Sequence, residues 1–336
     1  MLDKAVANDQ DAFVVVYSMI TEAQSKAWQQ VNKTLIDLYW SIGQYISERA
    51  ANNGWGKSIV EKMATYIATK NPSVTGFSAR NLWRMKQFYE TYQGDKKLST
   101  VLTEIGWSNH LHILAKTKTL EEKVYYLDLT AKHRYPAREL ARIIDSGTYE
   151  RTLLADAKLS TALTEFPTPT QGIFKDSYVF EFLGLPNNHK ENDLRQALVS
   201  HLKQFITELG ADFSLIGQEY PLQVGMKDFR IDLLMFHRGL NCMVAIELKT
   251  TDFHPAHIGQ LQFYLEALDC DIKKPHENPS IGILICKTKD DEVVKYTMNR
   301  SISPTLVAEY ETKLIDKALL QKKLRELNLL EPEEQT

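Results

Sequence analysis

The chain has 336 residues, of which 43% are hydrophobic and 25% are charged, and its formal net charge at pH 7 is −3. This length and apolar content allow at least one sizeable core and predict two domains. A net charge so close to zero argues against a protein that coats nucleic acid nonspecifically, although it can hide an uneven distribution.

Neither a targeting signal nor a cysteine framework is expected. No stretch approaches the ~20 consecutive apolar residues of a membrane span, and the first residues lack a signal-peptide pattern, so we expect a cytoplasmic protein without a membrane partner. Three cysteines, Cys242, Cys270 and Cys286, lie far apart and form no Cys-x-x-Cys pair. They predict small core residues rather than disulfides or a structural zinc site.

Charge is distributed unevenly along the chain. Residues 1–160 hold 21 basic and 17 acidic side chains, a net charge of +4, so the remainder carries −7. Residues 51–100 alone hold 8 basic and 3 acidic side chains. Three of the basic residues, Arg80, Arg84 and Lys86, are candidates for contacts with nucleic-acid phosphates, and an ordinary solvated helix face is the alternative.

The first half has the periodicity of helices. Between Ala12 and Ala50 apolar residues recur at three- and four-residue steps, which predicts one long helix or a helix pair. Gly54 and Gly56 interrupt the pattern, and Ser78 is a typical N-cap for another helix. Short helices joined by tight turns are the format of helix-turn-helix modules, which place a helix in the DNA major groove.

The segment IGWSNHLHILAK contains two histidines, and histidine side chains can bind metal or act as bases. Trp107, His110 and His112 lie there without an acidic residue at metal-ligand spacing. We therefore interpret Trp107 as a core residue and the histidines as structural.

A change in composition predicts the domain boundary. Residues 161–175 contain two prolines, a glycine and several small polar residues, which is typical of a linker. The predicted domains are a helical domain over residues 1–160, for binding DNA or a protein partner, and a second domain over residues 176–336.

The second half alternates helices with strands. ENDLRQALVSHLKQFITELG predicts a helix, and FSLIGQEYPLQV, FRIDLLMFH and CMVAIELKT predict strands, the last two joined as a hairpin by RGLN. HIGQLQFYLEALDC then predicts a helix and SIGILICK a buried strand. This order predicts an α/β domain with a mixed central sheet flanked by helices.

Three charged residues interrupt the predicted hairpin. Asp232 lies within one apolar strand, and Glu247 and Lys249 lie at the end of the other. Residues two apart on a strand point to the same face, where Asp232 on the neighbouring strand can meet them. Two carboxylates with a lysine can hold a hard divalent cation and orient water, which is equipment for phosphodiester hydrolysis. A buried ion pair that only ties the hairpin together is the alternative.

The same segments carry a family resemblance. IDLLMFHRGLNCMVAIELKT resembles the core motif of the PD-(D/E)XK nuclease superfamily. ENDLRQALVSHL, GQLQFYLEALD and NPSIGILICKTKDDEVVKYTM resemble the YhcG-type nucleases within it, and LYWSIGQYI, WGKSIVEKMA, GFSARNLWRMKQFY and WSNHLHIL resemble their helical N-terminal domain. The resemblance covers nearly the whole chain and implies a PD-(D/E)XK nuclease fold, divalent-metal phosphodiesterase chemistry and an N-terminal region for DNA or partner binding.

The resemblance also implies residue roles. Asp232 would be the central metal ligand, Glu247 the second ligand, and Lys249 the residue that positions the attacking water. Gln260 and Tyr264, four residues apart on the following helix, match a Gln-x-x-x-Tyr element that borders the metal site and the DNA strand. An ordinary polar helix face is their alternative interpretation.

One further ligand position is ambiguous. The first helix of this fold usually supplies an acidic ligand, and Glu191 is the best match. Where related sequences tend to have a second glutamate one turn later, this chain has Arg195. If that second position is the true ligand, the site has lost one metal contact, and a one-metal mechanism stays open.

Together these features predict a cytoplasmic endonuclease that uses Mg²⁺ or Mn²⁺ to hydrolyse DNA. A catalytically inactive DNA- or protein-binding module with the same fold is one alternative, and a nuclease directed at RNA is another. A homodimer is compatible with cutting two strands, but no sequence feature establishes it.

Overall fold

The structure is a computed structural model that describes residues 2–53, 56–156, 158–186, 188–299, 301 and 303–330. The chain divides into two compact units, Met1–Arg142 (unit 1) and Ile143–Thr336 (unit 2). Within the described residues, no helix is long and apolar enough to cross a membrane.

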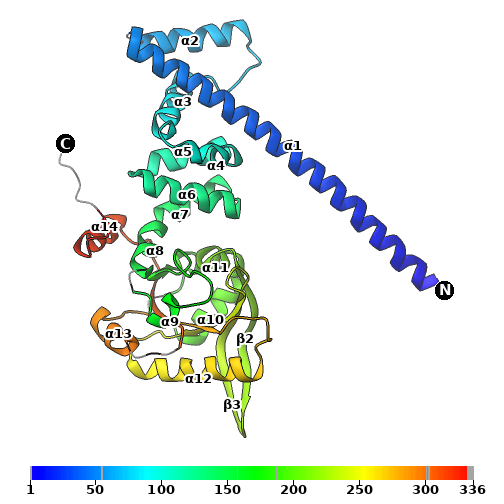
Figure 1. Cartoon of the computed structure of the whole chain (residues 1–336), viewed down its shortest axis with the longest axis vertical. Coiled ribbons are helices and arrows are strands. Elements are labelled where there is room, and N and C mark those ends of the chain that lie inside the picture. Colours follow the sequence, from blue (N-terminus) through cyan, green and yellow to red (C-terminus); the bar gives the residue numbers. More distant parts are fainter. Residues whose placement is uncertain are drawn as a thin grey trace. The chain divides into compact units, whose positions relative to one another are not determined.

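Unit 1 is built from helices, as predicted (Figure 1). Its first element, α1 (Leu2–Asn53), is one continuous helix rather than a helix pair. The helices that follow are α2 (Lys57–Lys70), α3 (Ala79–Tyr92), the 3-10 turn η1 (Lys96–Leu98), α4 (Ser99–Glu104), α5 (Trp107–Lys116), α6 (Leu120–His133) and α7 (Ala137–Asp145), whose last residues lie past the boundary at Arg142.

The packing of α1 against α3 depends on a glycine. Ile36, Tyr39 and Ile46 are buried on one face of α1. At Gly43 the backbones approach so closely that an added Cβ would lie 2.1 Å from the carbonyl oxygen of Met85. No side chain larger than hydrogen fits there unless the helices move apart.

Ser78 and His110 of unit 1 have the structural roles expected from the sequence. Ser78 caps α3, because its side chain accepts a hydrogen bond from the backbone N–H of Asn81. His110 is completely buried, with its Nε2 2.9 Å from the carbonyl oxygen of Leu102 and its ring against Phe88. Burial lowers the pKa of His110 to about 4. The structural interpretation of this histidine is therefore confirmed.

Unit 2 contains one six-stranded sheet with the order β1-β6-β5-β4-β3-β2. β1, β6, β5 and β4 are parallel, whereas β4, β3 and β2 are antiparallel, so the predicted mixed sheet and the predicted hairpin are confirmed. Neither β1 nor β6 is predicted from the sequence. The strands are β1 (Ser177–Val179), β2 (Phe213–Val224), β3 (Lys227–His237), β4 (Cys242–Leu248), β5 (Ile281–Cys286) and β6 (Thr305–Glu311).

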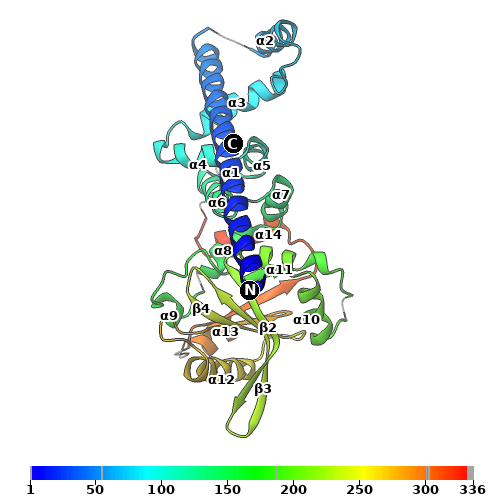
Figure 2. The ribbon, with the colours of Figure 1, turned by 90° about the vertical axis from the view of Figure 1, so that its right-hand side faces the viewer.

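Helices cover both faces of the sheet (Figure 2). The helix predicted before β2 is broken at His201 into α10 and α11, because His201 leaves helical geometry at φ −109° and ψ 37°. The helical elements of unit 2 are α8 (Thr148–Asp156), α9 (Thr161–Thr164), the 3-10 turn η2 (Glu181–Leu183), α10 (Glu191–Ser200), α11 (Leu202–Leu209), α12 (Pro255–Asp271), α13 (Asp291–Met298) and α14 (Lys317–Glu326).

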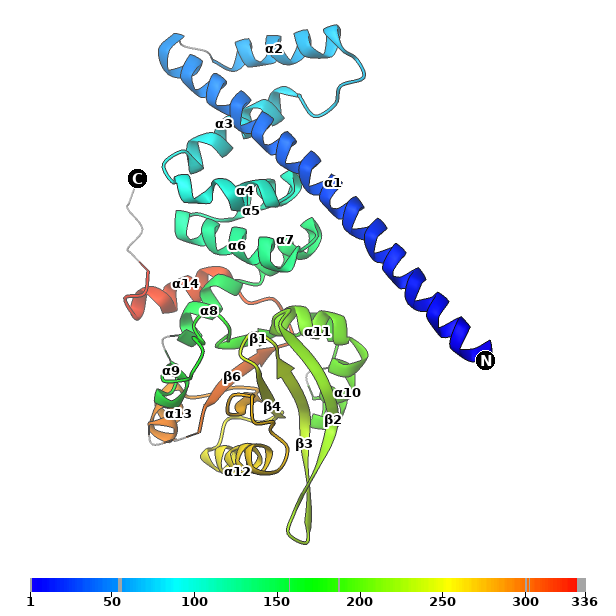
Figure 3. The same ribbon diagram turned by 45° about the vertical axis from the view of Figure 1, so that its right-hand side comes forward.

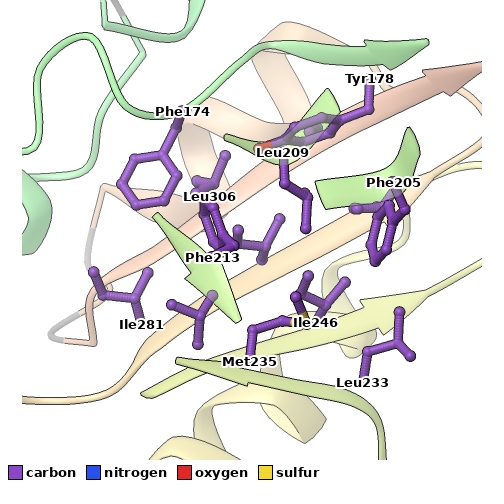
Figure 4. Close-up of a cluster of buried hydrophobic side chains, with 14 of the residues drawn as sticks. Phe174, Tyr178, Phe205, Leu209, Phe213, Leu233, Met235, Ile246, Ile281 and Leu306 are labelled. Carbon is purple, nitrogen blue, oxygen red and sulfur yellow. The ribbon is translucent and has the colours of Figure 1, made fainter. Parts of the chain in front are cut away.

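Two hydrophobic cores hold these layers together. On one face, Phe205 and Leu209 of α11 pack with Leu233, Met235 and other inward residues of the strands (Figure 4). On the other face, α12 packs against the alternate residues of the same strands. β2 and β3 continue beyond the covered part of the sheet as a two-stranded ribbon (Figure 3).

The segment expected to link the domains contributes to a core. It contains α9, and Leu163, Phe166 and Phe174 are buried with residues of the sheet. Its prolines and polar residues therefore belong to turns of a packed segment rather than to an exposed tether.

The cysteines follow the prediction in part. Cys242 and Cys286 are buried and free, but Cys270 is free and exposed. The expectation of a core residue at Cys270 is wrong, because the buried positions of α12 include Ala267 and Leu268 but not this one.

Candidate active site

The site lies where β4 ends. Residues of β4 alternate between the two cores, so Val244, Ile246 and Leu248 pack against one helical layer while Glu247 belongs to the opposite face. Lys249 follows the strand and continues its ladder by donating its backbone N–H to Ile285. Glu247 and Lys249 therefore lie on the same side at the strand end.

Asp232 is held against the same strand end from β3. Its Oδ2 accepts a hydrogen bond from the backbone N–H of Leu248 at 2.9 Å. That bond ties the carboxylate to the residue between Glu247 and Lys249. The structure thus brings together the three residues that the sequence singles out.

Glu247 is a buried carboxylate with unused hydrogen-bonding capacity. It is only 3% exposed, and its Oε1 accepts a hydrogen bond from Lys249 Nζ at 3.0 Å. Its Oε2 is buried and has no hydrogen-bond partner among the described residues. Burial raises the pKa of Glu247 to about 7, and the negative charge of Asp232 adds to the rise.

Lys249 is shared between two carboxylates. Its Nζ lies 3.0 Å from Glu247 and 3.5 Å from Oε2 of Glu191, the first residue of α10. Burial disfavours the charged ammonium, but the negative charge of Glu247 outweighs it and the pKa of Lys249 is raised. Lys249 therefore keeps its proton in this site.

Arg195 also enters the site, from the second turn of α10. One guanidinium nitrogen, Nη1, lies 2.7 Å from Oδ1 of Asp232, and Nη2 lies 3.0 Å from Glu219 and 2.8 Å from the side-chain oxygen of Asn192. The guanidinium therefore occupies one oxygen of the carboxylate that the resemblance assigns as the central metal ligand.

Glu219 is a site residue that sequence reasoning misses. It lies on β2 at the point where the pairing with β3 skips the position opposite Asp232, and its φ is 45°. A positive φ is uncommon for a residue other than glycine, and contacts with the rest of the fold are needed to hold it. The signal for it, an acidic residue in an edge strand, is too common to single out without the structure.

The α12 residues lie beside the carboxylates. Tyr264 is 3% exposed and accepts a hydrogen bond from Gln260 Nε2 at 2.7 Å. Burial raises the pKa of Tyr264, and the charges of Glu247 and Asp232 contribute. His257, not singled out from the sequence, also borders the site, since Lys249 contributes, after burial, to lowering its pKa.

The basic residues predicted to contact nucleic acid lie in unit 1. Arg80 is exposed, and Arg84 and Lys86 are half-buried. Arg80 and Arg84 line one pocket beside α2, whereas Lys86 is outside it and pairs with Glu90 at 2.6 Å. The structure therefore separates Lys86 from the other two.

Family comparisons cover both units. Residues 171–325 match the YhcG PDDEXK nuclease domain, and residues 15–151 match the DUF1016 N-terminal domain. Residues 171–325 are therefore a nuclease domain of the YhcG type within the PD-(D/E)XK superfamily. A protein of Escherichia coli (strain K12) named "Putative nuclease YhcG" is 28% identical to it over 346 aligned positions, which cover 92% of each chain. No solved structure gives a significant match.

The PD-(D/E)XK domain contains every residue of the site at the end of β4. Glu191, Arg195, Asp232, Glu247 and Lys249 all lie within residues 171–325. Arg80 and Arg84 lie within the DUF1016 N-terminal domain. The two sets of residues therefore belong to separately recognised parts of the family.

Nucleases of the PD-(D/E)XK type generally use divalent metal ions, and the donor set can be tested for such an ion. Mg²⁺ is usually held by one or two carboxylates, with water and phosphate oxygens completing its shell. Asp232 and Glu247 supply two carboxylates, and Glu247 Oε2 is a buried oxygen with a free coordination position. In the described part of the chain, no three acidic, histidine or cysteine residues form a ready cage. The residues fit one ion bound by two carboxylates.

Proposed function

We propose that this chain is an endonuclease that hydrolyses DNA phosphodiester bonds with Mg²⁺ or Mn²⁺ at Asp232, Glu247 and Lys249. The observation that carries the proposal is the buried carboxylate of Glu247, whose Oε2 has no hydrogen-bond partner among the described residues and lies beside two further charged groups. A fold does not gain stability by burying such an oxygen, because the lost hydration is not replaced. A bound cation would supply the missing partner.

Asp232 and Glu247 would hold the metal, and Glu191 is the candidate third ligand. When bound, a divalent ion polarises the scissile phosphate and lowers the pKa of a coordinated water. Because the Glu191 carboxylate contacts the Lys249 ammonium in the structure, its part in metal binding depends on movement of that lysine.

Lys249 would position the attacking water and balance charge on the phosphate. Its ammonium is held between Glu247 and Glu191, so its place is set before substrate arrives. Gln260 and Tyr264 on α12 would border the bound strand, and their mutual hydrogen bond fixes the tyrosine hydroxyl. Cutting both strands would take a second site, which a second copy of the chain would supply.

A catalytically inactive binding module is the second candidate, and one observation favours it. Arg195 occupies Oδ1 of Asp232 and so competes with any metal for the central carboxylate. If the ion pair persists in the presence of metal, the chain binds nucleic acid without turnover.

One experiment separates the candidates. Purified full-length protein is incubated with linear, supercoiled, branched and single-stranded DNA and with RNA, in Mg²⁺, in Mn²⁺ and in chelator. We expect cleavage of DNA only with metal, and no cleavage by Glu247→Gln under the same conditions. Cleavage of RNA alone would redirect the proposal to RNA. Binding of DNA without cleavage in either metal would replace the enzyme with the binding module.

A further inference from the structure

Unit 1 contains a pocket of about 470 Å³ between α2 and α3. We call it the α2–α3 pocket, and its functional side chains are Lys57 and Glu61 of α2 and Arg80, Trp83, Arg84 and Gln87 of α3. The volume is within the range of ~300–1,000 Å³ that is typical of small-ligand sites.

The α3 residues of the pocket share one face of the helix. Arg80, Arg84 and Gln87 follow each other at four- and three-residue steps, and Trp83 lies beside them. The opposite face of α3 carries the buried residues Leu82, Met85, Phe88 and Tyr92. The face toward the pocket is therefore not used by the core of unit 1.

The cationic side chains of the pocket are not balanced by ion pairs among the described residues. None of Lys57, Arg80 and Arg84 forms an ion pair with any described residue, and Glu61 is the single acidic side chain in the lining. Three positive charges against one negative charge repel each other, and two of them are one helical turn apart. An anion in the pocket would relieve this repulsion.

The first turn of α2 adds to the positive potential. Gly56 is the N-cap of this helix and provides no side chain to satisfy the first backbone N–H groups. Lys57 and Glu61, which line the pocket, belong to the first two turns. The positive end of the helix dipole is therefore close to the lysine of the pocket.

Lys86, on the same helix, is a cationic side chain whose charge is balanced by an ion pair. Its ammonium is 2.6 Å from Glu90 and 5.7 Å from the centre of the Trp83 ring. Its charge is already balanced, and it does not line the pocket.

We infer that the α2–α3 pocket binds one nucleotide of an unpaired nucleic-acid strand, with its phosphate on Arg80, Arg84 and Lys57 and its base against Trp83. This inference rests on the proposed function, whose substrate it narrows to DNA with a single-stranded segment. The arginine fork matches phosphate oxygens, and a tryptophan face accepts any base without a sequence code. In intact duplex the bases are stacked and paired and do not reach such a side chain.

The test is a binding measurement on the full-length chain with chelator present, so that no cleavage is needed. Fluorescence anisotropy compares a single-stranded DNA of about 20 nucleotides, the matching RNA and the matching duplex. We expect Arg80→Ala/Arg84→Ala to weaken single-strand binding about tenfold at 150 mM salt. The slope of log affinity against log salt should fall by roughly 0.7 for each lost phosphate contact.

Matched controls separate the pocket from general charge. Lys62 on α2 and Lys97 of η1 are exposed and lie outside the pocket. The double variant Lys62→Ala/Lys97→Ala removes the same two positive charges and should change affinity less than twofold. Glu61→Gln removes the acidic side chain of the pocket and should tighten binding severalfold, a gain that a misfolded variant cannot imitate.

Trp83→Leu tests the base contact. Stacking is not an ionic interaction, so this variant should weaken single-strand binding, leave the salt slope unchanged and leave duplex binding nearly unaffected. An equal loss on duplex would overturn the base contact. Loss of affinity in Arg80→Ala/Arg84→Ala no larger than in the double lysine control would overturn the pocket as a phosphate site. If wild-type protein cleaves nothing but these binding results hold, the proposed function fails and the pocket remains.

Discussion

The Nη1 atom of Arg195 lies 2.7 Å from Oδ1 of Asp232, and both side chains are largely buried. A guanidinium from α10 therefore neutralises the carboxylate that we propose as a metal ligand. The half-exposed carboxylate of Glu219 lies 3.0 Å from the same guanidinium. Arg195 therefore has a second partner with which it can stay paired if it leaves Asp232. The affinity of the site for metal should therefore depend on Arg195 and Glu219 as well as on Asp232.

Replacing Arg195 by Ala should increase metal affinity. The substitution removes a positive charge that competes for Asp232, and at the effective dielectric of a partly exposed site this is on the order of 1–2 kcal/mol, roughly tenfold. Isothermal titration of Mg²⁺ or Mn²⁺ into protein without DNA measures it. Arg195→Lys keeps the charge and should change metal affinity much less.

Glu219→Gln is the complementary change. It removes the second partner of Arg195 and leaves the guanidinium to Asp232, so metal affinity should fall, by about two- to fivefold because Glu219 is half-exposed. The same titration reports it. Equal metal affinity in Arg195→Ala, Glu219→Gln and wild type would show that the ion pair does not compete with metal.

The raised pKa of Glu247 should make the folding stability of the protein depend on pH when a chelator keeps metal away. Its pKa is raised from 4.5 to about 7 in the folded protein, so between these values the folded state binds more protons than the unfolded state. Stability should therefore decrease as pH rises from about 4.5 to about 7, by on the order of 3 kcal/mol. Glu247→Gln removes this dependence and should be the more stable protein at pH 8.

Urea unfolding at several pH values measures this difference. All five tryptophans lie within the first 107 residues, so tryptophan fluorescence follows unit 1. A transition seen by circular dichroism but not by fluorescence then belongs to unit 2. Parallel pH profiles for wild type and Glu247→Gln would mean that the carboxylate ionises normally.

Lys249→Ala should separate metal binding from catalysis. The change removes a cation beside the proposed ligands, so metal binding is retained or strengthened, while loss of the group that positions water lowers the cleavage rate about 10²- to 10⁴-fold. Titration calorimetry and single-turnover cleavage measure the two effects. Lys203→Ala, an exposed lysine on α11, is the control. Unchanged cleavage by Lys249→Ala would remove this lysine from the mechanism.

Two glycines in helices should respond to alanine in opposite directions. Gly43→Ala places a Cβ 2.1 Å from Met85 and should destabilise unit 1 by about 1–3 kcal/mol. An added Cβ at Gly259 of α12 would have no atom of the described residues within 4 Å, so Gly259→Ala should stabilise unit 2 by about 0.5–1 kcal/mol. Urea unfolding followed by fluorescence and circular dichroism tests both. A neutral Gly43→Ala would show that α1 and α3 can move apart freely.

Much of the fold follows from sequence spacing. Apolar periodicity predicts the helices of unit 1, Ser78 marks the start of α3, and alternation predicts the β3–β4 hairpin. The placement of Glu247 and Lys249 on one side of a strand end follows from the same two-residue period. These features depend on contacts between residues close in the chain, and local backbone geometry is sufficient to predict them.

Other features depend on residues far apart in the chain. Arg195 and Asp232 are 37 residues apart, and nothing in the spacing of either indicates that they pair. The spacing also gives no indication that Glu219 lies opposite Asp232, or that β1 pairs with β6 at the edge of the sheet. Lys86 and Arg84 look alike in the sequence, but Glu90 balances the charge of Lys86 alone.

The sequence by itself determined the chemical character of the site, two carboxylates and a lysine at the end of a buried strand. Tertiary structure decided how those charges are balanced: Arg195 lies on Asp232, Lys249 is shared between Glu247 and Glu191, and Glu247 Oε2 is left without a partner among the described residues. The physical reason is that burial and ion pairing depend on distances across the fold, whereas the residue types and their period along a strand are present in the sequence.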